Sequence, residues 1–257
     1  MGDDVFDFPK DETVLAEIVE MASSADDIVL DFFAGSGTTG HAVMAQNAAD
    51  GGNRRYILVQ LPEPLDPDNK DQKTAADFCG TLGKPRTIAE LTKERLRRAA
   101  AKVKADHPDT KADLGFRAYK LATSNIRAWN PGADLAADLL NAKDNLLPGR
   151  SEADLLVELL LKNGIDLTEP AVTRTLAGKT VNAFGNGALV VCLADIAESE
   201  AEALGDALAD WIAELAPVTQ SKFWFKDKGF GSNQAKLNLA AILDQRLGSK
   251  NIELRSL

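Results

Sequence analysis

The chain has 257 residues, enough for one large domain or two ordinary ones, and a formal net charge of −10. This acidic balance is unlike that of proteins that bind nucleic acid over their whole surface, because those are mostly basic. No apolar run approaches the roughly 20 residues that a membrane-spanning helix needs. Residues 1–25 lack the basic, apolar and small segments of a signal peptide. We therefore expect neither a membrane protein nor a secreted one.

The cysteine content also argues against a secreted protein. Only Cys79 and Cys192 occur, which is no disulfide framework, and no metal-ligand spacing joins them to His41 or His107. The sequence therefore predicts no metal site and a reducing, cytoplasmic environment.

Apolar periodicity predicts the elements of the first part of the chain. In order, they are a helix over 11–22, a strand over 28–32, a helix over 38–48, a strand over 56–61, a loop with a short helical piece over 62–85 and a helix over 87–104. After a linker at 107–110, the expected elements are a strand over 116–122, helices over 133–140 and 151–163, a hairpin over 180–193, a helix over 197–215, a strand over 221–225, a helix over 233–247 and a strand over 252–254. Three positions support this assignment: Ser151 is a helix cap, Asn186-Gly187 is a hairpin turn, and Pro217 ends a helix. We interpret Trp129, Trp211 and Trp224 as core residues of the second part, not as base-stacking platforms.

Charge is distributed unevenly. Residues 84–104 carry eight basic side chains against two acidic ones, whereas residues 151–216 carry twelve acidic side chains against three basic ones. The basic strip has two interpretations, a solvated helix face or a surface that contacts phosphates, and the residues alone leave both open.

Residues 28–40 are the most informative stretch. An apolar run ends in Asp31, and Gly35, Gly37 and Gly40 then satisfy G-x-G-x-x-G before a helix rich in small residues. This pattern suits a nucleotide-like ligand held against backbone N–H groups, but by itself it is a weak signal. It is not a Walker A loop, because His41 stands where that loop needs a lysine. A lone histidine at a helix start is read as structural rather than as a base.

The surrounding residues decide between ligands. Residues 31–39, Asp-Phe-Phe-Ala-Gly-Ser-Gly-Thr-Thr, resemble motif I of the DNA amino-methyltransferases, and residues 6–10 resemble their motif X. Residues 53–63 look like the second strand of the same domain. Weaker matches at 88–98, 114–117, 229–232 and 252–257 make most of the chain similar to the methylation subunit of Type III restriction–modification systems.

The resemblance implies an α/β fold: a partial Rossmann-like methyltransferase core over 1–110, then a smaller mixed α/β module over 111–257. It also implies S-adenosylmethionine as cofactor. The implied contacts to that cofactor are Phe8, Lys10, Asp31, Phe33, Gly35, Ser36, Gly37, Thr38, Thr39, Gln60 and Glu63. Asp31 would face the cofactor's ammonium group, and either Gln60 or Glu63 would hold its ribose. Phe33 could instead be a core residue, and Lys10 a surface lysine.

A Type III-like subunit would methylate the N6 amino group of adenine in double-stranded DNA. Any contact with DNA phosphates is expected from the basic helix over 87–104, through Lys93, Arg95, Arg97 and Arg98. The resemblance implies assembly of the second module with another methylation subunit or with the restriction subunit. Methyl transfer needs an Asp-Pro-Pro-Tyr-type motif, but no two prolines are adjacent in this chain. The chain therefore looks like the C-terminal portion of such a subunit, inactive alone and without catalytic residues of its own.

Two other functions remain open. A non-catalytic module of a split methyltransferase would bind cofactor, DNA or a sister subunit without transferring a methyl group. An NAD-binding oxidoreductase domain rests on G-x-G-x-x-G alone and lacks a visible hydride-transfer site.

Overall fold

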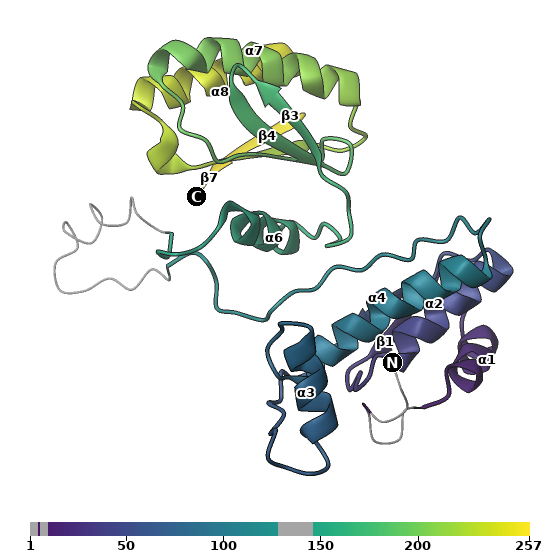
Figure 1. The fold of residues 1–257 in the computed structure, drawn as a ribbon. Coiled ribbons are helices and arrows are strands. Elements are labelled where there is room, and N and C mark those ends of the chain that lie inside the picture. The colour runs from purple at the N-terminus through teal and green to yellow at the C-terminus, as the bar shows by residue number, and fades with distance from the viewer. Residues whose placement is uncertain (1–4, 6–9, 128–145) are drawn as a thin grey trace. The chain divides into compact units, whose positions relative to one another are not determined.

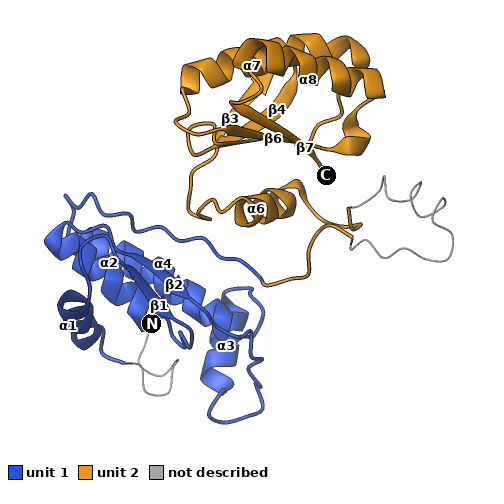
Figure 2. Ribbon diagram, turned by 180° about the vertical axis from the view of Figure 1, so that it is seen from behind, with its two compact units in different colours: residues 1–120 blue, residues 121–257 orange. Residues whose placement is uncertain are grey.

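The computed structural model describes residues 5, 10–127 and 146–257. The chain forms two compact units, unit 1 over residues 1–120 and unit 2 over residues 121–257 (Figure 2). Phe8, Trp129 and the helix predicted over 133–140 lie outside the described residues.

Unit 1 is built around two parallel strands joined by a helix (Figure 1). Its elements are α1 (Glu12–Ala22), β1 (Ile28–Asp31), α2 (Thr38–Asp50), β2 (Arg55–Leu58), α3 (Lys73–Thr81) and α4 (Ile88–Asp106). The predicted helices and strands of this part are confirmed, with ends that shift by up to three residues. The Asp11 carboxylate caps α1 by accepting a hydrogen bond from the N–H of Thr13 (2.8 Å).

The two faces of this small sheet differ. On one face, Tyr56 and Leu58 pack with Met44 of α2 and Leu96 of α4. The other face is apolar and open to solvent: it is formed by Ile28, Leu30 and Ile57 of the strands and continues with Phe32, Val59 and Leu61 just beyond the strand ends. These six residues are 48–64% exposed. Parallel sheets are normally covered on both faces, so this face is an unusual feature of unit 1.

A buried polar cluster fixes where α2 ends and β2 begins. The guanidinium of Arg54 donates to the Asp50 carboxylate (2.8 Å) and to the hydroxyl of Ser23 (3.0 Å). The Asn47 amide donates to the carbonyl of Arg54 (2.8 Å) and accepts from its N–H (3.1 Å). Because Arg54 and Asn47 are buried, their bonds offset a desolvation cost, and the end of α1 is tied to the strand that follows α2.

Unit 2 is a five-stranded sheet with helices on both faces. Its elements are α6 (Glu152–Lys162), β3 (Val172–Leu176), β4 (Lys179–Phe184), β5 (Leu189–Cys192), α7 (Glu198–Leu215), β6 (Ser221–Phe225), the short η2 (Asp227–Gly229), α8 (Asn233–Leu247) and β7 (Ile252–Ser256). The strands lie in sequence order: β3, β4 and β5 are antiparallel, while β5, β6 and β7 are parallel. Helices α7 and α8 lie together over one face in Figure 1.

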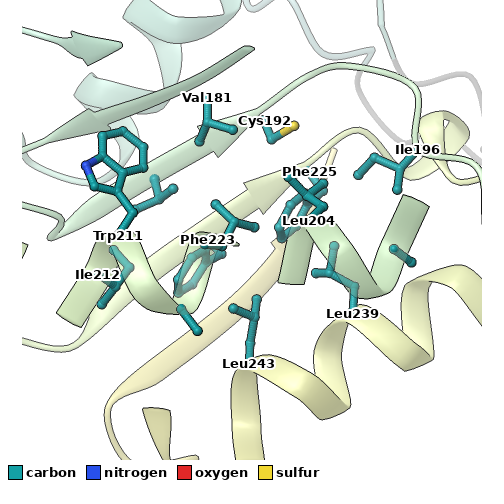
Figure 3. Packing of buried hydrophobic residues seen from close by; sticks show 14 of the residues in the cluster. Val181, Cys192, Ile196, Leu204, Trp211, Ile212, Phe223, Phe225, Leu239 and Leu243 are labelled. Carbon is teal, nitrogen blue, oxygen red and sulfur yellow. The ribbon is translucent and has the colours of Figure 1, made fainter. Parts of the chain in front are cut away.

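Alternating side chains divide the core of unit 2 into two layers. Val190 and Cys192 of β5 belong to the layer under α7 and α8, whereas Leu189 and Val191 belong to the layer under α6. Figure 3 shows the larger layer, in which Phe223 lies among residues of both helices. Trp211 is buried in this layer, and Trp224 is partly buried on the α6 side, as predicted for core residues.

Two sequence predictions for the second part need correction. Residues 116–122 do not form a strand, and no strand among the described residues pairs with this segment. Conversely, β3 was not predicted. It pairs with β4 through a turn at Ala177-Gly178, and both turn residues have positive φ (46° and 77°). Its residues are mostly exposed, so it lacks the apolar run by which buried strands are recognised.

The helix over 151–163 and the hairpin turn are confirmed. Ser151 and Asp154 form a capping box at the start of α6, and Asn186 and Gly187 have the positive φ of a tight turn. No helix in the described ranges has both the length and the apolar character needed to cross a bilayer.

Candidate functional site

The glycine loop, residues 32–37, runs from the end of β1 to the start of α2. Gly35 and Gly37 have φ of +51° and +81°, which L side chains rarely adopt, so glycine is required at both. The loop is anchored to β2 by a hydrogen bond from the N–H of Ala34 to the carbonyl of Val59 (3.1 Å). An added Cβ at Gly35 would meet only the Phe33 carbonyl, at 3.9 Å, so a ligand can approach this backbone closely.

Asp31 connects the strand, the loop and the helix. One carboxylate oxygen accepts from the N–H of Phe33 (3.1 Å), and the other accepts from the hydroxyl of Thr39 (2.6 Å). The side chain is only half-buried, so its charge is also accessible to a cation beside the loop.

Gln60 lies against the loop, whereas Glu63 does not. The Gln60 amide oxygen accepts from the N–H of Gly35 (2.8 Å), and its NH2 group donates to the carbonyl of Leu61 (3.1 Å). Glu63 lies beyond the end of β2, and its backbone carbonyl accepts from the N–H of Ile88 (3.1 Å). The Gln60 side chain, at the end of the second strand, therefore stabilises the conformation of the loop.

The start of α2 presents backbone donors. Gly37 is its N-cap and provides no side-chain cap, so the first-turn N–H groups, which include those of Thr38 and Thr39, have no partner within the helix. The hydroxyls of Ser36 and Thr38 are buried and lie 2.8 Å apart. These N–H groups and the helix dipole together favour an anionic group at this end of α2.

The two aromatic residues of the loop are exposed. Phe33 is 81% exposed, and its ring lies 5.1 Å from that of Phe32, so neither is a core residue of unit 1. Lys10 is also exposed.

Gly40 allows three elements to meet under the loop. An added Cβ would lie 2.6 Å from a methyl of Leu96, 3.0 Å from a methyl of Leu58 and 3.3 Å from the Tyr56 ring. The third glycine of the motif therefore permits close packing of α2 against α4 and β2. This role is what the spacing G-x-G-x-x-G requires of its last glycine.

His41 is 7% exposed in the first turn of α2. Burial lowers the pKa of its imidazole; Glu12 opposes this and Arg95 adds to it. The ring is therefore neutral at pH 7.

The basic residues of α4 are largely engaged with acidic ones. Lys93 pairs with Glu90, and Arg97 and Arg98 both pair with Glu94 (3.5 and 2.7 Å). The side chains of Arg97 and Arg98 remain 49% and 45% exposed. Arg95 differs, because its side chain is only 15% exposed and is directed at the loop, where it donates to the Ser36 hydroxyl (3.1 Å).

Sequence reasoning missed the contribution of α4 to this site. Thr92 donates to the carbonyl of Gly35 (2.6 Å), and Arg95 follows it on the same side of the helix. These contacts join residues 57 and 59 positions apart, so no local pattern could have revealed them.

A shallow hollow of about 360 Å³ lies in unit 2 rather than at the loop. Its charged side chains are paired, Lys179 with Glu200 (2.8 Å) and Asp195 with Lys226 (3.6 Å). The hollow therefore offers a ligand fewer free hydrogen-bonding groups than the start of α2 does.

A comparison with known protein families finds a match that includes the glycine loop. Residues 2–62, which include motif X, β1, the glycine loop, α2 and β2, match the family model described as DNA methylase.

Three relatives extend the comparison beyond these residues. The StyLTI Mod subunit of a Type III restriction-modification enzyme, from Salmonella typhimurium, is 47% identical over 122 residues, which cover 48% of this chain and 17% of the relative. The EcoPI Mod subunit from Escherichia phage P1 is 30% identical over 99% of this chain and 37% of its own length. The EcoP15I Mod subunit from Escherichia coli is 33% identical over 64% of this chain and 23% of its own length.

The chain thus spans between about a sixth and somewhat over a third of the length of these relatives. Its first 62 residues carry the DNA methylase match, and the chain is similar to a portion of the Mod subunits of Type III restriction–modification enzymes.

Proposed function

We propose that this chain supplies the S-adenosylmethionine-binding part of a DNA adenine-N6 methyltransferase subunit of a Type III restriction–modification system. The observation that carries the proposal is the glycine loop between Asp31 and Thr39, where an accessible carboxylate lies beside a helix start that has no side-chain cap. S-adenosylmethionine carries both an ammonium and a carboxylate at its amino-acid end. The carboxylate of Asp31 suits the first, and the start of α2 suits the second.

We propose further that unit 1 is a partial Rossmann-like core. The parallel order β1–α2–β2 supports this, as does the open apolar face of the sheet, which includes Leu30 and Val59. In a doubly wound fold both faces of such a sheet are covered by helices, so further elements would be needed to bury this face.

The ribose of the cofactor belongs, in this proposal, near Gln60. Its amide lies beside the loop, and its NH2 group could exchange the nearby Leu61 carbonyl for a ribose hydroxyl. Glu63 is the alternative, because its exposed carboxylate is an acceptor for a diol. Phe33 would pack against the cofactor, and Lys10, with Phe8, would lie at its methionine end.

Titration of the full chain with S-adenosylmethionine and with NAD tests the cofactor. We expect measurable heat and an increase in melting temperature with S-adenosylmethionine and with its demethylated product, and neither effect with NAD. Binding of NAD without binding of S-adenosylmethionine would favour the oxidoreductase alternative instead.

The chain alone is proposed not to transfer methyl groups, since it has no adjacent prolines and hence no Asp-Pro-Pro-Tyr motif. A tritium-transfer assay on mixed-sequence DNA measures this. Incorporation above a no-protein blank that disappears in Asp31→Ala would contradict the proposal, whereas cofactor binding without transfer fits a non-catalytic module.

Contact with double-stranded DNA is proposed for the outer side of α4. Arg97 and Arg98 are the most exposed of its four implicated cations, and Lys93 lies one helical turn away. We expect the Arg97→Gln/Arg98→Gln double variant to weaken low-salt DNA binding about tenfold and to flatten its salt dependence, because two phosphate contacts are lost. The matched control is Arg246→Gln on α8, which should bind like the wild type in fluorescence anisotropy.

Unit 2 is proposed as the assembly module, for a second methylation subunit or the restriction subunit. Helix α7 carries six acidic residues and no basic one, which disfavours approach to phosphates. Light scattering of the chain, alone and mixed with a restriction subunit, tests this, and monomers under both conditions would contradict it.

The cytoplasm is the proposed setting, because Cys79 and Cys192 are buried free thiols; recovery of the protein in another cell fraction would argue against it.

A further inference from the structure

We propose that Thr92 of α4, assisted by Arg95, is a positioning residue that holds the Gly35–Gly37 turn in its ligand-ready conformation. The proposal rests on the proposed function, in that the ligand is S-adenosylmethionine. It assigns to α4 a role at the loop that differs from phosphate contact.

The hydroxyl of Thr92 has two possible acceptors. It lies 3.0 Å from the carbonyl of Ile88, the usual partner of a helical threonine, and 2.6 Å from the carbonyl of Gly35. A hydroxyl has a single proton to donate, and the shorter distance favours Gly35. Thr92 is 5% exposed, so water does not replace this bond readily.

Gly35 is consequently held on both sides of its α-carbon. Its N–H donates to Gln60 from β2, and its carbonyl accepts from Thr92 of α4. A glycine with φ of +51° has many alternative conformations, and the two bonds together select one of them. The Gly35 carbonyl belongs to the same peptide unit as the N–H of Ser36, so fixing it also fixes the direction of that donor.

The methyl group of Thr92 has a separate contact. An added Cβ at Gly37 would lie 3.0 Å from this methyl, so the backbone of Gly37 packs closely over it. Threonine thus provides a hydroxyl for Gly35 and a methyl for Gly37 at one position.

Arg95 adds a third connection. Its guanidinium donates to the Ser36 hydroxyl (3.1 Å), whereas its nearest carboxylate, that of Glu12, is 4.0 Å away. Burial lowers the pKa of Arg95, which is nevertheless charged at pH 7. Its closest polar contact is therefore the loop, not a salt bridge.

This arrangement matters for affinity because a loose glycine turn must be ordered when a ligand binds. A loop that is already held does not incur that entropy cost at the moment of binding. Removal of the Thr92 hydroxyl should therefore weaken ligand binding, although Thr92 itself does not contact the ligand in this proposal.

The test compares Thr92→Val, which keeps the shape and the methyl but has no hydroxyl, with Thr92→Ser, which keeps the hydroxyl. Thr81→Val is the matched control, because the Thr81 hydroxyl donates only to the Phe78 carbonyl of its own helix (2.7 Å). Two properties are measured on the full chain: amide hydrogen exchange at Gly35 and Gly37 without ligand, and the Kd for S-adenosylmethionine by calorimetry.

For Thr92→Val we expect the exchange rate at both amides and the Kd each to increase about fivefold. This factor corresponds to the loss of one ordinary hydrogen bond. Thr92→Ser and Thr81→Val should stay within about twofold of the wild type, at a similar melting temperature. Arg95→Gln should also raise exchange at the turn.

Three results would overturn the positioning role: unchanged exchange in Thr92→Val, unchanged affinity in that variant, or a loss in Thr92→Ser as large as in Thr92→Val. A wild-type chain that binds no S-adenosylmethionine is a different outcome. It would refute the proposed function, and the exchange measurements alone would then decide whether Thr92 orders the turn.

Discussion

Replacement of Asp31 by alanine is expected to weaken S-adenosylmethionine binding by about 1–3 kcal/mol, the usual cost of a lost charge-assisted hydrogen bond. The structure adds a second reason for a loss. The carboxylate also holds the N–H of Phe33 and the hydroxyl of Thr39, so alanine would loosen both ends of the glycine loop.

Asp31→Asn separates these two contributions. Asparagine keeps the size and one acceptor oxygen for the Thr39 hydroxyl, but it has no charge for an ammonium group. We expect it to lose affinity at low salt while retaining more of the loop's order than alanine does. Asp27→Asn is the matched control, because Asp27 accepts from the N–H of Ser24 before β1 and lies outside the loop. Calorimetry that finds equal affinity in Asp31→Ala and the wild type would sink the assignment of this carboxylate.

Replacement of Phe223 by alanine is expected to destabilise unit 2 by about 3–5 kcal/mol, the typical cost of a large cavity in a packed core. Phe223 is fully buried at the centre of β6, where it is the register partner of Val190 on β5. It packs with residues of α7 and α8 (Figure 3). Phe223→Leu should cost less, about 1–1.5 kcal/mol, because most of the volume is kept.

Tryptophan fluorescence during guanidinium denaturation measures this change selectively. The three tryptophans, Trp129, Trp211 and Trp224, all belong to unit 2, so the signal reports that unit and not unit 1. Val218→Ala is the control, since Val218 is fully exposed and should change stability by less than about 0.5 kcal/mol. A Phe223→Ala transition within 1 kcal/mol of the wild type would mean that this core is not packed as described.

The position of the glycine loop and most of the elements could be predicted from the sequence because their signals are local. Ser151 begins α6 by a capping box, and Asn186-Gly187 supplies the positive φ of the hairpin turn. The helix over 233–247 and the strand over 221–225 were predicted with their observed bounds, since apolar periodicity repeats within each segment.

The errors concern segments whose state depends on pairing with another strand. Residues 116–122 have a strand-like composition but pair with no strand in the part of the chain that the structure describes, whereas β3 pairs with β4. Strand propensity mainly reflects packing against neighbours, so the segment alone could not decide either case.

The sequence by itself determined the chemistry of the candidate site: a carboxylate at Asp31, a turn that requires glycine at 35 and 37, and a helix that starts just after it. Only the tertiary structure decided how that turn is held, because Gln60 and Thr92 reach Gly35 from positions 25 and 57 residues away. It also decided that Arg95 faces the loop while Arg97 and Arg98 face outward. The physical reason is that the basic side chains of α4 are distributed around the helix. Which of them becomes buried depends on what the helix packs against.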